Sequence, residues 1–107
     1  MAYVIVTVSA MHDRAMNQEY VRRFMPLIRS MGGSVLAVDE TPDVKEGTWN
    51  VVRTALLYFP TVADANRFYH SSEYQEILPL RLKSVDSTVV ILRGVEEVAA
   101  GAKGKTQ

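Results

Sequence analysis

The segment YVIVTV (residues 3–8) is apolar on both of its alternating sides, and this property decides the predicted fold class. All three even-numbered positions are valine, and the odd-numbered positions hold Tyr3, Ile5 and Thr7. Valine, isoleucine, threonine and tyrosine favour extended backbone, so residues 3–10 are predicted to form a strand. A sheet with one face in water alternates apolar and polar residues, so this strand is expected to be covered on both faces.

Three further segments are predicted to be strands, over residues 34–38, 51–59 and 87–93. The last two are again apolar at both odd and even positions. Between the strands, apolar spacing and capping residues predict helices over residues 14–31, 62–70 and 72–79. Asp13, Thr61 and the Ser71-Ser72 pair are the expected N-caps, and Gly32-Gly33 is the expected end of the first helix.

The resulting order is β-α-β-β-α-β, with the second helical region interrupted at Ser71-Ser72, which is typical of an α+β, ferredoxin-like fold. Right-handed crossovers place the helices on one face of a four-stranded antiparallel sheet. The other face would then expose several hundred Å² of apolar surface, which monomers rarely tolerate. We therefore expect a homodimer in which two sheets pack face to face as a dimeric α+β barrel.

Composition narrows the class of protein. The chain has 107 residues, 12 Lys and Arg against 12 Asp and Glu, and no cysteine. This length fits one domain, expected over residues 1–95, with a flexible tail over residues 96–107. Zero net charge argues against a nucleic-acid partner, and the charges divided by segment indicate no basic face. No apolar run is long enough to span a membrane, and no export signal precedes the first strand, so we expect a cytoplasmic protein.

The chain resembles the domain-of-unknown-function 1330 family of the dimeric α+β barrel superfamily. The matching segments are residues 2–6, Gly32-Gly33, residues 46–49, Phe59-Pro60, and residues 68–75 and 78–81. The resemblance implies the dimeric barrel and no assigned reaction, with relatives that include cofactor-free monooxygenases, isomerases and ligand-sensing modules. The sequence departs from the family at residues 38–40, where members often have Arg-Gly-Gly, so a cation for an anionic ligand is missing there.

Catalytic chemistry has little support in the sequence. His12 and His70 lack the spacing of metal ligands, so neither a metal nor another cofactor is expected. Ser71 and Ser72 flank His70, but adjacent residues rarely meet as nucleophile and base. His70 remains the weak candidate for a catalytic residue, as a titratable group beside two tyrosines.

The candidate ligand-binding residues are three aromatic rings and one cation: Trp49, Tyr69, Tyr74 and Arg81. The functional interpretation is a pocket between helices and sheet, in which Arg81 or Arg53 holds a carboxylate or enolate. Two structural alternatives stay open: the rings could simply belong to the core, and Arg81 could form an ion pair with Asp86.

Two functions follow from such a pocket. One is a homodimeric module that binds a small organic acid or aromatic molecule, and the other is a cofactor-free monooxygenase-like or isomerase-like enzyme that uses general acid–base chemistry. The enzyme requires a titratable group, such as His70 or Glu46, that points into an enclosed cavity. If both residues face solvent, the binding module is favoured.

Overall fold

The computed structural model describes residues 1–97. The elements in chain order are β1 (Ala2–Met11), α1 (Arg14–Ser30), β2 (Ser34–Asp39), β3 (Arg53–Phe59), α2 (Val62–His70), α3 (Ser72–Ser84) and β4 (Val85–Arg93). The flexible tail predicted from residue 96 lies, from residue 98 onward, outside the described residues. Within the described part of the chain, no helix is long and apolar enough to cross a membrane.

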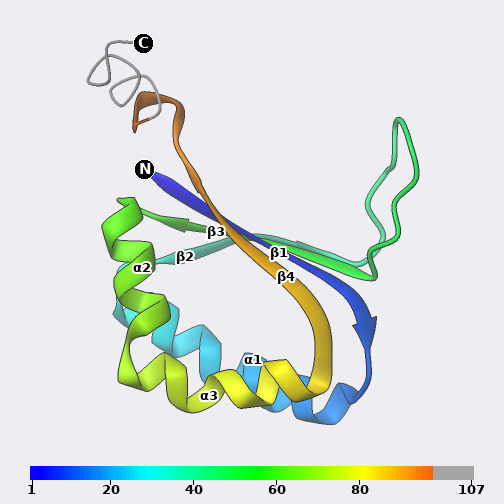
Figure 1. The fold of residues 1–107 in the computed structure, drawn as a ribbon, viewed down its shortest axis with the longest axis horizontal. Helices are drawn as coiled ribbons and strands as arrows, with labels where there is room; N and C mark the ends of the chain where they lie inside the picture. Colours follow the sequence, from blue (N-terminus) through cyan, green and yellow to red (C-terminus); the bar gives the residue numbers. More distant parts are fainter. Residues whose placement is uncertain (98–107) are drawn as a thin grey trace.

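The four strands form one antiparallel sheet in the order β2-β3-β1-β4 (Figure 1). β1, which the sequence singled out, lies inside the sheet and pairs with both β3 and β4. Val8 lies opposite Arg53 of β3 and also opposite Ser87 of β4. The predicted α+β, ferredoxin-like fold is therefore confirmed. The predicted dimeric barrel requires a second copy of the chain and stays a prediction.

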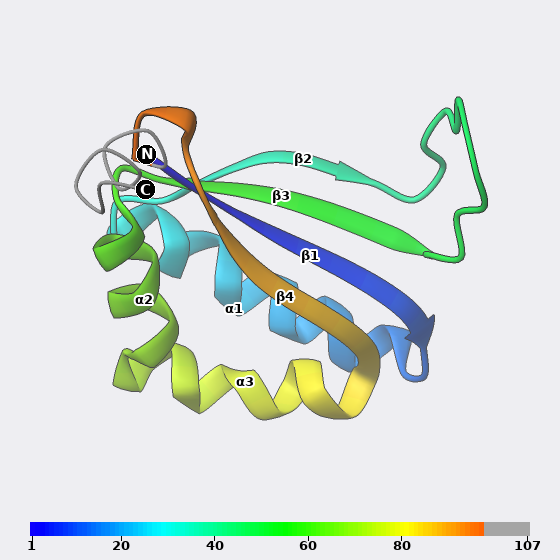
Figure 2. The ribbon, with the colours of Figure 1, turned by 45° about the horizontal axis from the view of Figure 1, so that its top comes forward.

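Within residues 1–97, the helices α1, α2 and α3 lie on the same side of the sheet and none of them lies on the opposite side (Figure 2). The core between the two layers is built from buried residues of β1 and β3, such as Val4 and Phe59, and from Phe24 and Phe68 of the helices. These apolar side chains are removed from water when the chain folds, and this burial provides the main driving force for folding.

The uncovered side of the sheet is apolar, as the alternation of β1 predicted. Val90 and Leu92 of β4 are 43% and 46% exposed. They pair across the sheet with Ile5 and Tyr3, which are half-buried and lie on the same side. We call this side of the sheet the outer face.

Most predicted helix ends are confirmed by capping contacts. Met16 N–H donates to the Asp13 carboxylate at 2.9 Å, and Asp64 N–H donates to the Thr61 hydroxyl at 3.0 Å. At the start of α3 the cap is Ser71, whose hydroxyl accepts from the Tyr74 N–H at 3.1 Å. Ser72 is the first residue of the helix.

The predicted end of the last helix at Pro79 is wrong, because α3 continues through Pro79 to Ser84. Proline removes one backbone hydrogen bond, but Pro79 lies on the exposed side of the helix, where the freed carbonyl can contact water. The Ser84 carbonyl accepts hydrogen bonds from the backbone N–H groups of His12 and Asp13, so the end of α3 is fastened to the start of α1.

Candidate ligand-binding cleft

A cleft of about 890 Å³ lies between the sheet and the helices. The helix-facing side chains of all four strands form its floor. Side chains of α1, α2 and α3 form its walls. The principal lining residues are Val4, Val6, Val8, Val35, Ala55, Leu57, Val89 and Ile91 of the strands, and Tyr20, Phe24, Met25, Phe68, Tyr69, Tyr74 and Arg81 of the helices. A largely apolar cleft with few polar groups is typical of a small-molecule site.

Aromatic rings form the wall opposite the sheet. Tyr74 contacts Phe68 with ring centroids 4.9 Å apart and Tyr69 with centroids 5.5 Å apart. Phe24 lies edge-on to Phe68 at 5.7 Å. Because Tyr74 belongs to the buried core and also lines the cleft, the structural and functional interpretations of these rings both hold for it.

Two tyrosine hydroxyls meet inside this wall. The hydroxyl oxygens of Tyr20 and Tyr74 are 2.8 Å apart and share a hydrogen bond. Burial, together with the adjacent Tyr74 hydroxyl, raises the pKa of Tyr20 well above its usual range, although the nearby Arg81 guanidinium acts in the opposite direction. Tyr20 therefore stays protonated at every pH at which the protein would work.

Arg81 lies beside this pair and is only 5% exposed. Its Nε donates to the Tyr74 hydroxyl at 3.3 Å, and one terminal nitrogen donates to the Ser87 hydroxyl at 2.6 Å. Burial, the largest single effect, lowers the pKa of Arg81, but Tyr74, Tyr20 and Tyr69 together outweigh it and the pKa is raised, so the side chain is a cation. Within residues 1–97, no carboxylate lies within 4.0 Å of this guanidinium.

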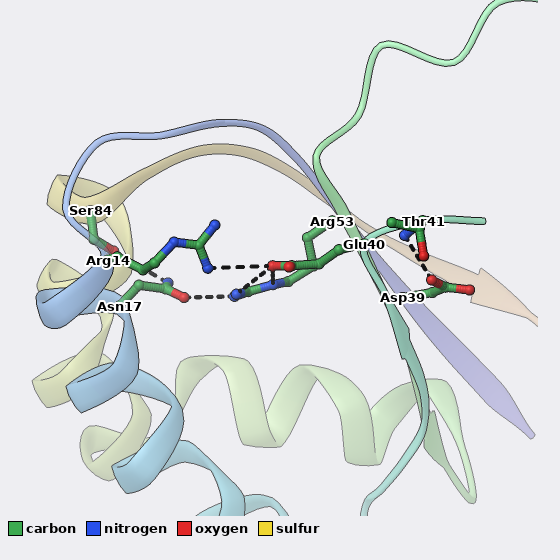
Figure 3. A network of polar contacts seen from close by, with 7 residues as sticks. All are labelled: Arg14, Asn17, Asp39, Glu40, Thr41, Arg53 and Ser84. Atoms are coloured by element: carbon green, nitrogen blue, oxygen red, sulfur yellow. Dashed lines mark hydrogen bonds and ion pairs between the residues drawn. The ribbon is translucent and has the colours of Figure 1, made fainter.

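A second arginine approaches the cleft from β3 (Figure 3). One terminal nitrogen of Arg53 donates to the amide oxygen of buried Asn17 at 2.6 Å. Its Nε and other terminal nitrogen contact one oxygen of Glu40 at 3.0 and 2.9 Å. The same Glu40 oxygen lies 3.7 Å from Arg14, and the Asn17 amide donates to the Ser84 hydroxyl at 3.3 Å.

The charged residues that line the cleft are mostly basic. Among the described residues they are Arg14, Arg22, Arg53 and Arg81, with Glu40 as the single carboxylate. The charges divided by segment, which predicted no basic face, did not indicate this grouping of arginines in the cleft. These arginines come from three different elements, so a count along consecutive segments does not bring them together.

The structure brings three of the four predicted binding residues together. Tyr69, Tyr74 and Arg81 all line the cleft, whereas Trp49 is 45% exposed on the loop between β2 and β3 and does not line it. His70 borders the cleft but is exposed, and its ring lies edge-on to that of Tyr69.

The ion pair considered between Arg81 and Asp86 does not form. The Asp86 carboxylate lies 3.0 Å from Nε2 of His12 instead. Asp86, the second residue of β4, is exposed, whereas the buried Arg81 donates its hydrogen bond to Ser87.

Sequence reasoning missed Asn17, Glu40 and Ser87. Asn17 carried a usable signal, because it lies one turn before Tyr20 on the buried side of α1, where a polar side chain requires a partner. Glu40 lines the cleft from the residue after β2, and Ser87 of β4 accepts the hydrogen bond of Arg81; neither position in the sequence indicates these contacts.

Comparisons with known proteins identify the family of this chain. The family model described as domain of unknown function (DUF1330) matches residues 1–95. The chain belongs to this family. A search among curated proteins found no match.

Solved structures share the fold of this DUF1330 protein. A protein of unknown function from Rhodopseudomonas palustris has a TM-score of 0.67 and 20% identity, with coverage of 88% of this chain and 82% of the other. A dimeric ferredoxin-like protein of unknown function from Jannaschia sp. has a TM-score of 0.66 and 16% identity, covering 87% and 98%. An antibiotic biosynthesis monooxygenase has a TM-score of 0.58 and 20% identity, covering 89% and 99%. At these identities the similarity shows the fold alone.

Proposed function

We propose that this DUF1330 protein is a cytoplasmic homodimer that binds a small organic acid with an apolar or aromatic body in the cleft of each protomer. Arg81 holds the acid group, and Tyr69 and Tyr74 contact the body. Trp49, on the loop outside the cleft, is not part of the proposed site.

The observation that carries this proposal is the burial of the Arg81 cation without a carboxylate partner among residues 1–97. Arg81 as a whole residue is 5% exposed, so its guanidinium loses most of its hydration, and such a charge is ordinarily paired. Here its partners within residues 1–97 are two neutral hydroxyls, those of Tyr74 and Ser87. A ligand carboxylate in the adjoining cleft would supply the missing negative charge through a charge-assisted hydrogen bond.

Binding is favoured over catalysis by where the titratable groups lie. His70 is exposed at the edge of the cleft, and Glu46 is exposed on the loop between β2 and β3. Tyr20, a buried titratable group of the wall, is held protonated. A cofactor-free enzyme needs a base poised to remove a proton, and these positions supply poor candidates. The similarity to a monooxygenase fold supports the enzyme only weakly.

The dimer is supported by the outer face and by the fold. Val90 and Leu92 expose large apolar side chains on a side that none of the described helices covers. A structural neighbour from Jannaschia sp. with the same fold is described as dimeric. Packing two outer faces together would remove both apolar surfaces from water.

Calorimetry with aromatic and aliphatic monocarboxylates, such as 4-phenylbutanoate and octanoate, tests the binding site. We expect saturable binding by the wild type that Arg81→Gln weakens about ten- to a hundredfold. The control is Arg29→Gln, which removes an equal charge from the exposed side of α1. If neither acid binds, or if both variants behave alike while remaining folded by circular dichroism, the proposal is wrong.

A further inference from the structure

The acid-binding end of the cleft contains a second cation, Arg53, which is in register with Ser87, the hydrogen-bond partner of Arg81. Arg53 and Ser87 both lie opposite Val8, on the strands to either side of β1. Directly paired residues place their side chains on the same face of a sheet, so both lie on the helix-facing side with Val8, and Val8 and Arg53 line the cleft. Two interstrand spacings separate their Cα atoms by about 10 Å. Because Arg81 donates to Ser87, the Arg53 and Arg81 guanidinium groups lie at the same end of the cleft.

The carboxylate that neutralises Arg53 remains partly exposed to water. Glu40 follows the last residue of β2, and its side chain is 43% exposed. Its side-chain contacts within the described residues are with Arg53 and Arg14. Moving a partly exposed carboxylate from a protein cation into water costs little free energy. A ligand anion that binds Arg53 could therefore displace Glu40.

Arg53, in contrast, is fixed independently of Glu40. Its side chain is only 20% exposed, and its terminal nitrogen is held at 2.6 Å by Asn17, which is 4% exposed and bound in turn to Ser84. If Glu40 moved away, the Asn17 contact would keep the guanidinium directed into the cleft. Figure 3 shows Arg53 between these two partners.

We propose that the natural ligand is a dianion, a dicarboxylate with a short spacer and an apolar substituent. One carboxylate binds Arg81 and the other replaces Glu40 on Arg53. The apolar substituent extends along the floor of β1 and β3 toward the aromatic wall. Glu40 is then a built-in competitor that keeps Arg53 neutralised until the ligand arrives. This inference rests on the proposed function, since it specifies the class of acid that the same cleft binds.

Benzylsuccinate and 4-phenylbutanoate form a matched pair of probes, because they differ by one carboxylate. A second charge-assisted contact predicts that the wild type binds benzylsuccinate about tenfold more tightly. Arg53→Gln should remove this preference, because it should lower the affinity for benzylsuccinate about tenfold more than that for 4-phenylbutanoate. Glu40→Gln should raise the affinity for benzylsuccinate several-fold more than that for 4-phenylbutanoate.

The control for Glu40→Gln is Asp43→Asn, which removes one negative charge from the same loop at a carboxylate paired with Lys45. We expect it to change neither affinity beyond a general effect of charge, which added salt would screen. A dicarboxylate preference that survives Arg53→Gln, or equal effects of Glu40→Gln on both probes, would overturn the dianion inference and leave the Arg81 site standing. If neither probe binds the wild type, the inference and the proposed function fail together.

Discussion

Tyr74 and Arg81 lie seven residues apart on α3, and Nε of Arg81 donates a hydrogen bond of 3.3 Å to the Tyr74 hydroxyl. Seven residues are two helical turns, so both side chains project from one side of α3 into the cleft. Pro79 lies between them, on the exposed side of the same helix. The continuation of α3 beyond Pro79 is therefore what brings the cation to the aromatic wall.

Removing the Tyr74 hydroxyl should destabilise the protein more than removing its Tyr20 partner. Tyr74→Phe leaves both the Tyr20 hydroxyl and an Arg81 N–H without their partner, a loss of about 1–3 kcal/mol. Tyr20→Phe leaves the Arg81–Tyr74 contact intact and should cost about 1 kcal/mol. Urea unfolding at a fixed protein concentration measures both. The double variant should be less destabilised than the sum of the two, and strict additivity would show that the hydroxyl pair contributes nothing.

The raised pKa of Tyr20 predicts a loss of stability at high pH. The folded-state pKa lies above the unfolded value of 10.0, so the folded state retains the hydroxyl proton longer than the unfolded chain does. Its contribution is fully present below about pH 10 and is lost as the pH rises toward the folded-state pKa. The free energy of unfolding, measured between about pH 8 and 11, should fall less steeply in Tyr20→Phe than in the wild type. Parallel curves for the two proteins would contradict the burial of this group.

Gly33 should tolerate no side chain. It follows Gly32, whose positive φ of 86° ends α1, and its N–H donates to the Ile28 carbonyl at 2.9 Å. A Cβ atom at Gly33 would lie 2.6 Å from Ile28 and 2.6 Å from the ring of Phe59, both buried in the core. Gly33→Ala is expected to cost about 1–3 kcal/mol by overpacking, measured by thermal unfolding. Ser34→Ala at the adjacent exposed position is the control, and equal stability of the two variants would refute the clash.

The outer face predicts a charge-sensitive dimer. Leu92→Glu places a carboxylate in the proposed interface and should shift the protein to a monomer at about 10 µM, measured by light scattering after size exclusion. Leu82→Glu is the matched control, because Leu82 is 61% exposed on α3, on the helical side. A monomeric wild type, or a Leu92→Glu variant that remains dimeric, would exclude association through this face.

The features that depend on local interactions along the chain could be predicted from the sequence, and those that depend on tertiary contacts could not. Strand and helix order depend on local periodicity and caps, so Asp13, Thr61 and Gly32 could be identified from their neighbours in the chain. The end of α3 could not, because the cost of Pro79 is local whereas its compensation is tertiary. His12 and Asp13, more than seventy residues earlier, bind the Ser84 carbonyl and hold the last turn in place.

The same distinction applies to the cleft. Tyr69, Tyr74 and Arg81 could be nominated as rings and a cation that lie close together in the sequence, although Arg81 was expected beyond the last helix, and Trp49 could be nominated only by residue type. Its position on an exposed loop depends on the path of the chain between β2 and β3. Asn17, Glu40 and Ser87 acquire their roles from contacts that span 36, 13 and 6 residues, and no periodicity predicts such contacts.

The sequence by itself determined the apolar alternation of β1, the order of elements and hence the ferredoxin-like sheet with an uncovered apolar face. These properties arise from side-chain pattern and backbone preference, which act over a few residues. Only the tertiary structure decided the charge of the cleft. A chain with no net charge places arginines from α1, β3 and α3 around one apolar space, because strand register and helix docking, rather than sequence distance, determine which charges meet.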